Sequence, residues 1–140
     1  MHPKPELWAA AEQNDTAKVD ELLCQGKDPD EKFQGWTPLM KASEEGNIET
    51  MALLLNTGRV DIEAENKKGR TALSFACAPS NNKGIRHEAQ TDAIELLLRS
   101  NADPEHKDQR NNTPKDYAAR EHREDALRAL LGVNFIKSEG

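Results

Sequence analysis

The chain has 140 residues, the size of a single domain. Its formal net charge is −6 and only 36% of its residues are hydrophobic. No apolar run approaches the ~18–20 residues that span a membrane, and the first six residues lack the apolar segment of a secretory signal. The acidic balance disfavours a general nucleic-acid binder. We therefore expect a protein that engages neither membranes nor nucleic acids.

The cysteines and the distribution of charge add two further expectations. Cys24 and Cys77 have no CxxC spacing, so they predict neither a disulfide framework nor a zinc site. We interpret both as reduced thiols of a cytoplasmic and/or nuclear protein. Residues 1–66 contain 14 acidic and 6 basic residues, a net charge of −8, whereas residues 67–140 contain 11 acidic and 13 basic residues, a net charge of +2. The average charge therefore describes neither half.

In chain order, the predicted elements form four copies of one unit, with a period of about 34 residues. The last three copies share a threonine followed five positions later by an alanine: Thr37 with Ala42, Thr71 with Ala76, and Thr113 with Ala118. Each copy then reaches a leucine-rich second helix. The pattern predicts one domain over 1–132 with repeats at about 5–31, 32–65, 66–107 and 108–132, and a tail over 133–140.

Local signals support a pair of helices in each copy. Threonine before proline, as in Thr37-Pro38, favours a helix start, because the threonine accepts a backbone N–H and proline has none to lose. Gly26, Gly58 and Asn101 stand where the second helix ends and a positive φ is expected. The second helix of copy two carries apolar residues at helical spacing, namely Ile48, Met51, Leu54 and Leu55. Such a unit buries its apolar stripe only by stacking on the next copy.

The segment Gly35-Trp36-Thr37-Pro38-Leu39, repeated along the chain, resembles the ankyrin repeat with its T-P-L-H-x-A signature. The resemblance covers residues 5–132 and implies an all-α solenoid of stacked helix-turn-helix units with finger turns. Three residues stand where that signature has histidine: Met40, Ser74 and Asp116. Three acidic turn residues stand where many ankyrin repeats have asparagine: Asp30, Glu63 and Glu105.

The third copy is longer than the second. Thr71 and Leu96 are 25 positions apart, against 16 for Thr37 and Leu53. The surplus is rich in Pro, Asn and Gly, which predicts a loop insertion at about 79–88 between the two helices of this copy. Insertions in repeat arrays often lie on the binding face.

We find no pattern for catalysis. The chain has no glycine-rich phosphate loop, no HExxH and no GxSxG, and its four histidines are scattered. The adjacent Glu44 and Glu45 are interpreted as a solvated helix end. We therefore expect no enzyme, no cofactor and no metal.

The resemblance implies protein–protein recognition through a concave side, which finger turns and first helices form. Transferred by position, it selects ten candidate partner-binding residues: Trp8, Phe33, Trp36, Met40, Glu44, Lys67, Lys68, Arg70, Arg110 and Arg120. The aromatic members suit an interface hot spot, although Trp8 packed under the first copy and Phe33 covering a helix end are alternatives. The basic members suggest an acidic peptide or protein patch with an apolar end on Trp36, an ordinary solvated finger being the alternative.

The sequence is compatible with three functions. The leading hypothesis is a scaffold or adaptor module, monomeric on its own, that binds a protein partner on its concave face. The second is a stoichiometric inhibitor or regulatory subunit of an enzyme such as a kinase, like the similar four-repeat cyclin-dependent kinase inhibitors. The third is nucleic-acid or anionic-lipid binding through residues 67–70, whose affinity would fall steeply with salt.

Overall fold

The computed structural model describes residues 3–78, 87–120 and 126–130, with only the backbone given for residues 87–89. Its helices are α1 (Glu6–Glu12), α2 (Thr16–Cys24), α3 (Pro38–Glu45), α4 (Ile48–Asn56), α5 (Ala72–Cys77), α6 (His87–Arg99) and α7 (Pro114–Arg120). Residues 126–130 are also helical. The tail predicted over 133–140 lies outside the described residues. So does the insertion, except that its last two predicted positions already belong to α6.

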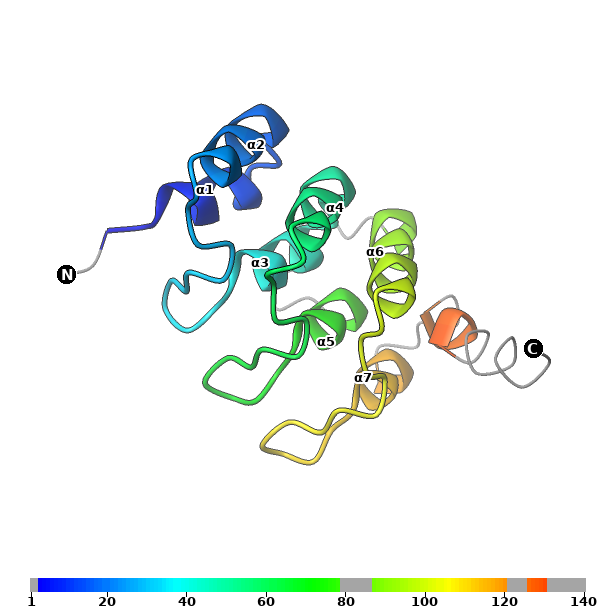
Figure 1. The fold of residues 1–140 in the computed structure, drawn as a ribbon. Helices are drawn as coiled ribbons and strands as arrows, with labels where there is room; N and C mark the ends of the chain where they lie inside the picture. The colour runs from blue at the N-terminus through cyan, green and yellow to red at the C-terminus, as the bar shows by residue number, and fades with distance from the viewer. Residues whose placement is uncertain (1–2, 79–86, 121–125, 131–140) are drawn as a thin grey trace.

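The helices form two layers, as Figure 1 shows. In the inner layer α1 packs against α3, α3 against α5, and α5 against α7, while in the outer layer α2 packs against α4 and α4 against α6. Three long turns project beside the inner layer: the α3 finger (residues 28–37), the α5 finger (61–71) and the α7 finger (103–113). The predicted all-α solenoid with finger turns is confirmed, and the four repeat boundaries stay predictions.

Threonine caps start two of the inner helices. Thr37 Oγ1 accepts the Met40 N–H at 3.2 Å, with Pro38 at the first helical position, and Thr113 Oγ1 accepts the Asp116 N–H at 3.2 Å. The caps are reciprocal, because the Thr37 N–H donates to Met40 Sδ at 3.4 Å and the Thr113 N–H to Asp116 Oδ2 at 3.0 Å. The residue at the signature's histidine position thus still supplies an acceptor to the threonine N–H in both helices.

The outer helices end at the positions where the sequence predicts a positive φ. Gly26, Gly58 and Asn101 have φ values of +85°, +67° and +73°, the left-handed conformation that was expected there. Small residues let the layers approach: Ala42, Ala76 and Ala118 are fully buried. Large side chains fill the space between neighbouring repeats, and the largest fully buried ones include Leu22, Leu39, Met51, Leu54, Phe75 and Leu97.

Neighbouring fingers lie in direct contact. The Gln109 N–H donates to the Lys68 carbonyl at 3.0 Å, which joins the α5 and α7 fingers. A Cβ at Gly69 would lie 2.9 Å from the Gln109 nitrogen, and Gly69 has a φ of +77°. This glycine therefore serves both the turn and the close approach of the next finger.

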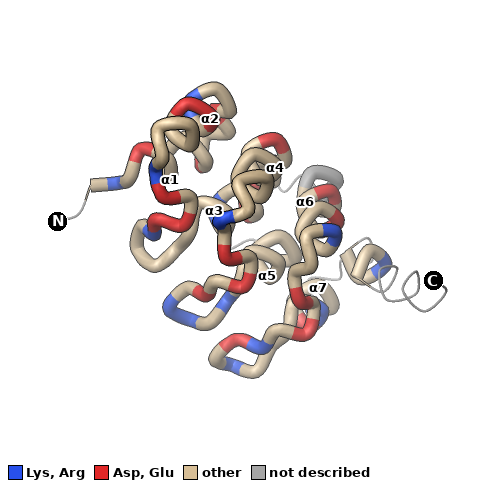
Figure 2. Tube along the Cα trace, viewed as in Figure 1, with Lys and Arg blue, Asp and Glu red and all other residues tan. Residues whose placement is uncertain are grey.

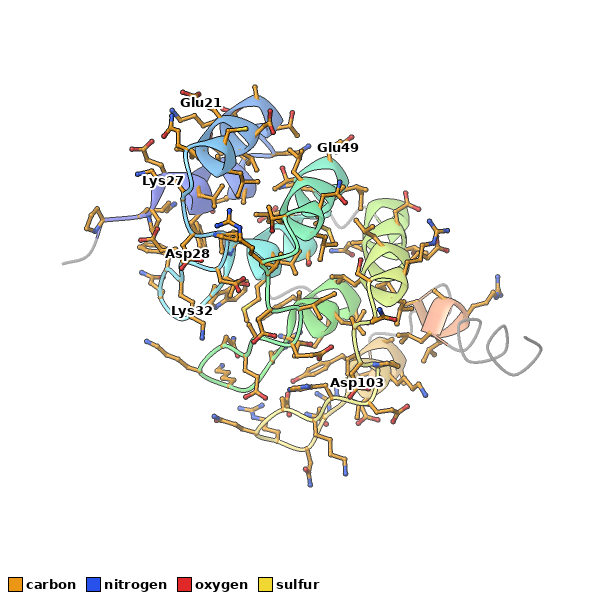
Figure 3. The ribbon with its side chains drawn as sticks, viewed as in Figure 1. Glu21, Lys27, Asp28, Lys32, Glu49 and Asp103 are labelled. Atoms are coloured by element: carbon orange, nitrogen blue, oxygen red, sulfur yellow. The ribbon has the colours of Figure 1, made fainter. Side chains whose placement is uncertain are left out.

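Carboxylates connect successive repeats at the base of the fingers. Asp30 Oδ2 accepts the Asp61 N–H at 2.8 Å, and Glu63 Oε2 accepts the Asp103 N–H at 2.7 Å. Asp103, at the start of the α7 finger, is labelled in Figure 3. Asp30 and Glu63 are two of the acidic residues that stand where many ankyrin repeats have asparagine. These two inter-repeat hydrogen bonds are called the carboxylate rungs below.

The first rung predicts a pH-dependent gain from Asp30→Asn. Burial raises the pKa of Asp30, and the charges of Asp28 and Asp61 add to the rise, although the hydrogen bond from the Asp61 N–H and the charge of Lys32 oppose it. A carboxyl group whose pKa is raised by folding destabilises the folded chain only when it is ionised. The amide keeps the oxygen acceptor and removes the charge, so we expect Asp30→Asn to raise Tm at neutral pH by about 2 °C, a small value because solvent screens this site.

The gain should shrink as the pH falls and vanish below the ordinary aspartate value of 3.8, where Asp30 itself is protonated. Thermal unfolding followed by circular dichroism across this range measures it. Glu31→Gln, at an exposed neighbouring position, is the control and should leave Tm nearly unchanged. A gain that persisted at low pH would contradict the electrostatic cause.

Candidate protein-binding surface

A row of stacked side chains runs along the inner helix layer and its fingers. The rings of Trp36 and Phe75 pack with centroids 4.1 Å apart and an interplanar angle of 33°. The Arg70 guanidinium carbon lies 4.1 Å from the Phe75 centroid and 4.3 Å from that of Tyr117, and Arg120 lies 5.6 Å from Tyr117. These five residues, called the stacked row below, come from three successive repeats and fix one another through aromatic and cation–π contacts.

Arg70 is committed to this structure and is not a free cation. Its Nη2 donates to the carbonyls of Ser74 at 2.8 Å and Ala78 at 2.7 Å, and its Nε donates to Ser74 Oγ at 3.2 Å. It therefore satisfies carbonyls at the carboxyl end of α5, where a cation also suits the helix dipole. Burial lowers the pKa of Arg70, but a guanidinium stays charged throughout the pH range of a folded protein. Arg70 thus has a structural role within the chain, and its contact with a partner stays a prediction.

Asp108 shapes the finger that follows. Its Oδ1 accepts the N–H groups of Arg110 at 2.8 Å and Asn112 at 2.9 Å, and its Oδ2 accepts the Tyr117 hydroxyl. Burial alone would raise the pKa of Asp108, but these hydrogen bonds and the charge of Arg70 outweigh it, so this pKa lies below its usual range. Burial and the bond to Asp108 raise the pKa of Tyr117. An ionised carboxylate thus holds the loop of the α7 finger.

The aromatic group predicted near the amino terminus is largely structural. Trp8 is 6% exposed, and its Nε1–H donates to the Trp36 carbonyl at 3.0 Å. Phe33 is half-buried and meets Trp8 edge to face at 5.0 Å between centroids, while Lys4 Nζ lies 5.3 Å from the Trp8 centroid. The alternative in which Trp8 packs under the first repeat is therefore correct, and its exposure to a partner is not.

Two further candidates, Met40 and Glu44, are also buried, at 0% and 2% exposure. Met40 turns back toward Thr37, whose N–H its sulfur accepts. Glu44 pairs with Lys41 at 3.0 Å, and its carbonyl accepts a hydrogen bond from Gln90 Nε2 at 3.2 Å. The interpretation of Glu44 as part of a solvated helix end is therefore wrong, because its side chain is buried and paired with Lys41.

Lys41 is a residue of this surface that the sequence analysis missed. Its Nζ lies 3.0 Å from Glu44, 3.2 Å from Glu45 and 3.9 Å from Glu12, and 5.6 Å from the Trp36 centroid. Burial lowers the pKa of Lys41, but the hydrogen bonds and charges of Glu44 and Glu45 outweigh it, so the pKa is raised. Spacings of three and four residues on one helix, Lys41 to Glu44 and Glu45, were the signal available in the sequence.

The remaining candidates lie at the surface. Lys67, Lys68 and Arg110 are exposed, and so is Arg120, whose Nη2 donates to Asn112 Oδ1 at 3.2 Å. Trp36 is half-buried, with its outer part left to solvent. Figure 2 shows basic residues at the tips of the α5 and α7 fingers. The structure thus offers one half-exposed indole and a set of fingertip cations.

Neither a metal centre nor a membrane segment is found in the part of the chain that the structure describes. No three histidine, cysteine or acidic side chains there are grouped to hold a metal ion. His106 lies between two carboxylates, 3.3 Å from Glu63 and 2.7 Å from Glu65, across neighbouring fingers. None of the described helices combines the length and apolar character needed to cross a bilayer.

Stacked helix pairs with finger turns define a repeat solenoid, a class of protein built around an extended surface. The chain belongs to the ankyrin repeat family: a model of ankyrin repeats in three copies matches residues 7–108. A crystal structure of EF0377, an ankyrin repeat protein, superposes with a TM-score of 0.77 at 30% identity, covering 92% of this chain and 63% of that one.

Curated relatives carry the same repeats within longer proteins. The chain is 40% identical over 107 residues to the ankyrin repeat, SAM and basic leucine zipper domain-containing protein 1 of Echinops telfairi, covering 76% of this chain and 21% of the relative. The protein of the same name from Colobus guereza is 37% identical over 119 residues, covering 84% and 24%. The chain therefore spans less than a quarter of the length of these relatives.

Proposed function

We propose that this chain is a scaffold or adaptor module that binds a partner protein through its concave face and performs no catalysis. Ankyrin repeats are generally protein–protein interaction modules, and this family is typically non-catalytic. The observation that carries the proposal is the stacked row, which holds the half-exposed Trp36 ring in one orientation. A rigid aromatic ring buries much area on binding and loses little entropy, as interface hot spots require.

Trp36→Ala tests this proposal. We expect it to weaken binding of the cognate partner by more than ~1 kcal/mol, the scale of an interface hot spot. Because Trp36 packs on Phe75 and on the core, the substitution also costs stability, so binding is measured by calorimetric titration at a temperature where circular dichroism shows the variant to be folded. The partner is first captured by affinity purification and identified by mass spectrometry.

Two control variants accompany Trp36→Ala. Trp36→Phe preserves a ring on Phe75 and should retain most of the stability, which separates loss of the indole from loss of the fold. Gln25→Ala, at an exposed position after α2, should change neither binding nor stability. Unaltered partner affinity in a folded Trp36→Ala variant would contradict binding through the concave face. An activity assay on the captured partner then distinguishes a scaffold from a stoichiometric inhibitor or regulatory subunit.

The cysteines bear on the cellular compartment in which the chain is found. Neither cysteine is part of a disulfide, and Cys24 lies at the surface and Cys77 in the core. Free thiols suit a reducing compartment, so we place the module in the cytoplasm and/or nucleus. We also propose that it is a monomer until its partner binds. Sedimentation velocity on the purified chain measures the assembly state.

A further inference from the structure

Three cations lie together at the tips of two adjacent fingers. Lys67 and Lys68 belong to the α5 finger and Arg110 to the α7 finger, and all three are exposed. The hydrogen bond from the Gln109 N–H to the Lys68 carbonyl, at 3.0 Å, holds the two fingertips side by side. Within the described residues none of the three forms an ion pair with this chain's own acids. They are called the fingertip patch below.

Several bases of the inner helices and the fingers are already engaged by groups of this chain. Lys4 pairs with Glu12 at 3.0 Å, Lys41 pairs with the acids of α1 and α3, and Lys115 pairs with Glu105. Arg70 donates to backbone carbonyls. In a chain with a net charge of −6, acids are abundant, yet none of the described ones covers the fingertip patch. The three cations of the patch, held side by side on two adjacent fingers, are therefore open to acids of a partner.

The acidic residues nearest to the patch are engaged by groups other than its three cations. Asp108 accepts hydrogen bonds from its own loop and from Tyr117. Glu65 pairs with His106 at 2.7 Å. Lys32, labelled in Figure 3 on the α3 finger, donates to the Glu65 carbonyl at 3.2 Å and so lies against the same side of the α5 finger. Asp108 is buried, so the exposed charged side chains at positions 66–69 and 109–112 are those of Lys67, Lys68 and Arg110.

The patch is also held in place before any partner arrives. Asn66 Oδ1 accepts the N–H groups of Lys68 at 3.0 Å and Arg70 at 2.9 Å, which closes the α5 finger as Asp108 closes the α7 finger. The stem of Lys67 lies against Gly35, where an added Cβ would be 3.1 Å from Lys67 Cγ. Lys67 therefore extends the patch toward the α3 finger, which carries Trp36. Loops fixed in this way lower the entropy lost on binding.

We propose that the fingertip patch binds a run of carboxylates in an acidic segment of the partner protein, and that an apolar residue next to this run packs on Trp36. This inference rests on the proposed function and adds the chemistry of the partner. Charge complementarity supports this inference, because three cations held close together attract a negatively charged partner and steer its approach. A nucleic acid fits less well, since a continuous phosphate backbone would also pass the acids at the finger bases, including the carboxylate rungs.

The test is a phage-displayed library of random peptides selected against the purified chain. We expect the enriched peptides to combine several Asp or Glu residues with one aromatic or aliphatic residue. A synthetic peptide of the enriched sequence, labelled with fluorescein, is then titrated by anisotropy. The triple variant Lys67→Gln, Lys68→Gln and Arg110→Gln should bind it about tenfold more weakly, the sum expected of three exposed ion pairs, and added salt should remove most of that difference.

A matched control removes the same charge elsewhere. Lys27, Arg59 and Arg99 are exposed bases at the ends of the three outer helices, and Figure 3 labels Lys27 there. Lys27→Gln, Arg59→Gln and Arg99→Gln together should leave the peptide affinity within about twofold of the parent chain, as residues away from an interface do. Equal weakening by both triple variants would show a general charge effect and overturn the inference.

Further outcomes separate this inference from the proposed function. Enriched peptides without acids, whose binding depends on Trp36 and ignores the fingertip patch, would overturn the inference and leave the proposed function standing. Peptides whose binding ignores both Trp36 and the patch would contradict the proposed function as well. A labelled oligothymidylate that binds more tightly than the acidic peptide, and loses affinity in the fingertip variant, would assign the patch to nucleic acid instead.

Discussion

Replacing Arg70 with methionine should lower the free energy of unfolding by about 2–4 kcal/mol, measured by urea unfolding followed by circular dichroism. The guanidinium donates to the carbonyls of Ser74 and Ala78 and lies between the rings of Phe75 and Tyr117. Hydrogen bonds to a charged group contribute about 1.5–3 kcal/mol, and a desolvated cation–π contact up to about 2 kcal/mol. Methionine fills part of the volume but removes the guanidinium hydrogen bonds, so the Ala78 carbonyl loses its Arg70 donor and the Ser74 carbonyl keeps only the Ala78 N–H.

The control for Arg70 is a change of shape at constant charge. Arg70→Lys retains the positive charge but lacks the planar fork that reaches both carbonyls while stacking on two rings, so we expect it to recover less than half of the loss. Arg110→Met, on the exposed fingertip, should change stability by less than about 0.5 kcal/mol. If Arg70→Met and Arg110→Met unfolded at the same urea concentration, Arg70 would be a surface residue and the stacked row would be incorrect.

Leu54→Ala should lower the free energy of unfolding by about 2–5 kcal/mol, the cost of emptying a buried leucine site. Leu54 has no exposed surface and lies on the face of α4 that meets the core between the layers. A repeat array has no single large centre that could collapse around the cavity. The same urea titration measures the loss, and the slope of the transition shows whether unfolding stays two-state.

Leu53, the preceding residue, provides the matched comparison because it is only partly buried. Leu53→Ala should cost no more than about half as much as Leu54→Ala, since less apolar area returns to water. The order of the two effects follows directly from the helical register of α4. A larger loss at Leu53 than at Leu54 would show that the register is displaced by one residue.

The fold could be predicted from the sequence because its signals are local and recur. Thr37 and Thr113 cap helices with their own side chains, and Gly26, Gly58 and Asn101 end helices by a conformation that few residues adopt. Each signal depends on neighbours a few positions away, and the period repeats it. The Thr71 site shows the limit, because no side-chain cap forms there although the residue is the same.

The candidate surface could be predicted only in part, because position along a repeat gives the backbone and not the course of the side chain. Met40 and Glu44 stand on the inner helix as expected, but the thioether turns back to Thr37 and the carboxylate turns to Lys41. Arg70 finds its acceptors at the carboxyl end of α5, and that end depends on where the helix stops. The exposure of Lys67 was predictable from its place at a finger tip, but the contact of its stem with Gly35 of the α3 finger was not.

In both carboxylate rungs the acceptor belongs to the earlier repeat and the N–H donor to the later one. Each rung joins a carboxylate of one repeat to an N–H of the next, so the amides of Asp61 and Asp103 are protected only while the preceding repeat stays docked. In a linear array such contacts belong to the coupling between neighbours and not to the stability of either unit. These two amides therefore report, through their hydrogen exchange, how often adjacent repeats part without either one unfolding.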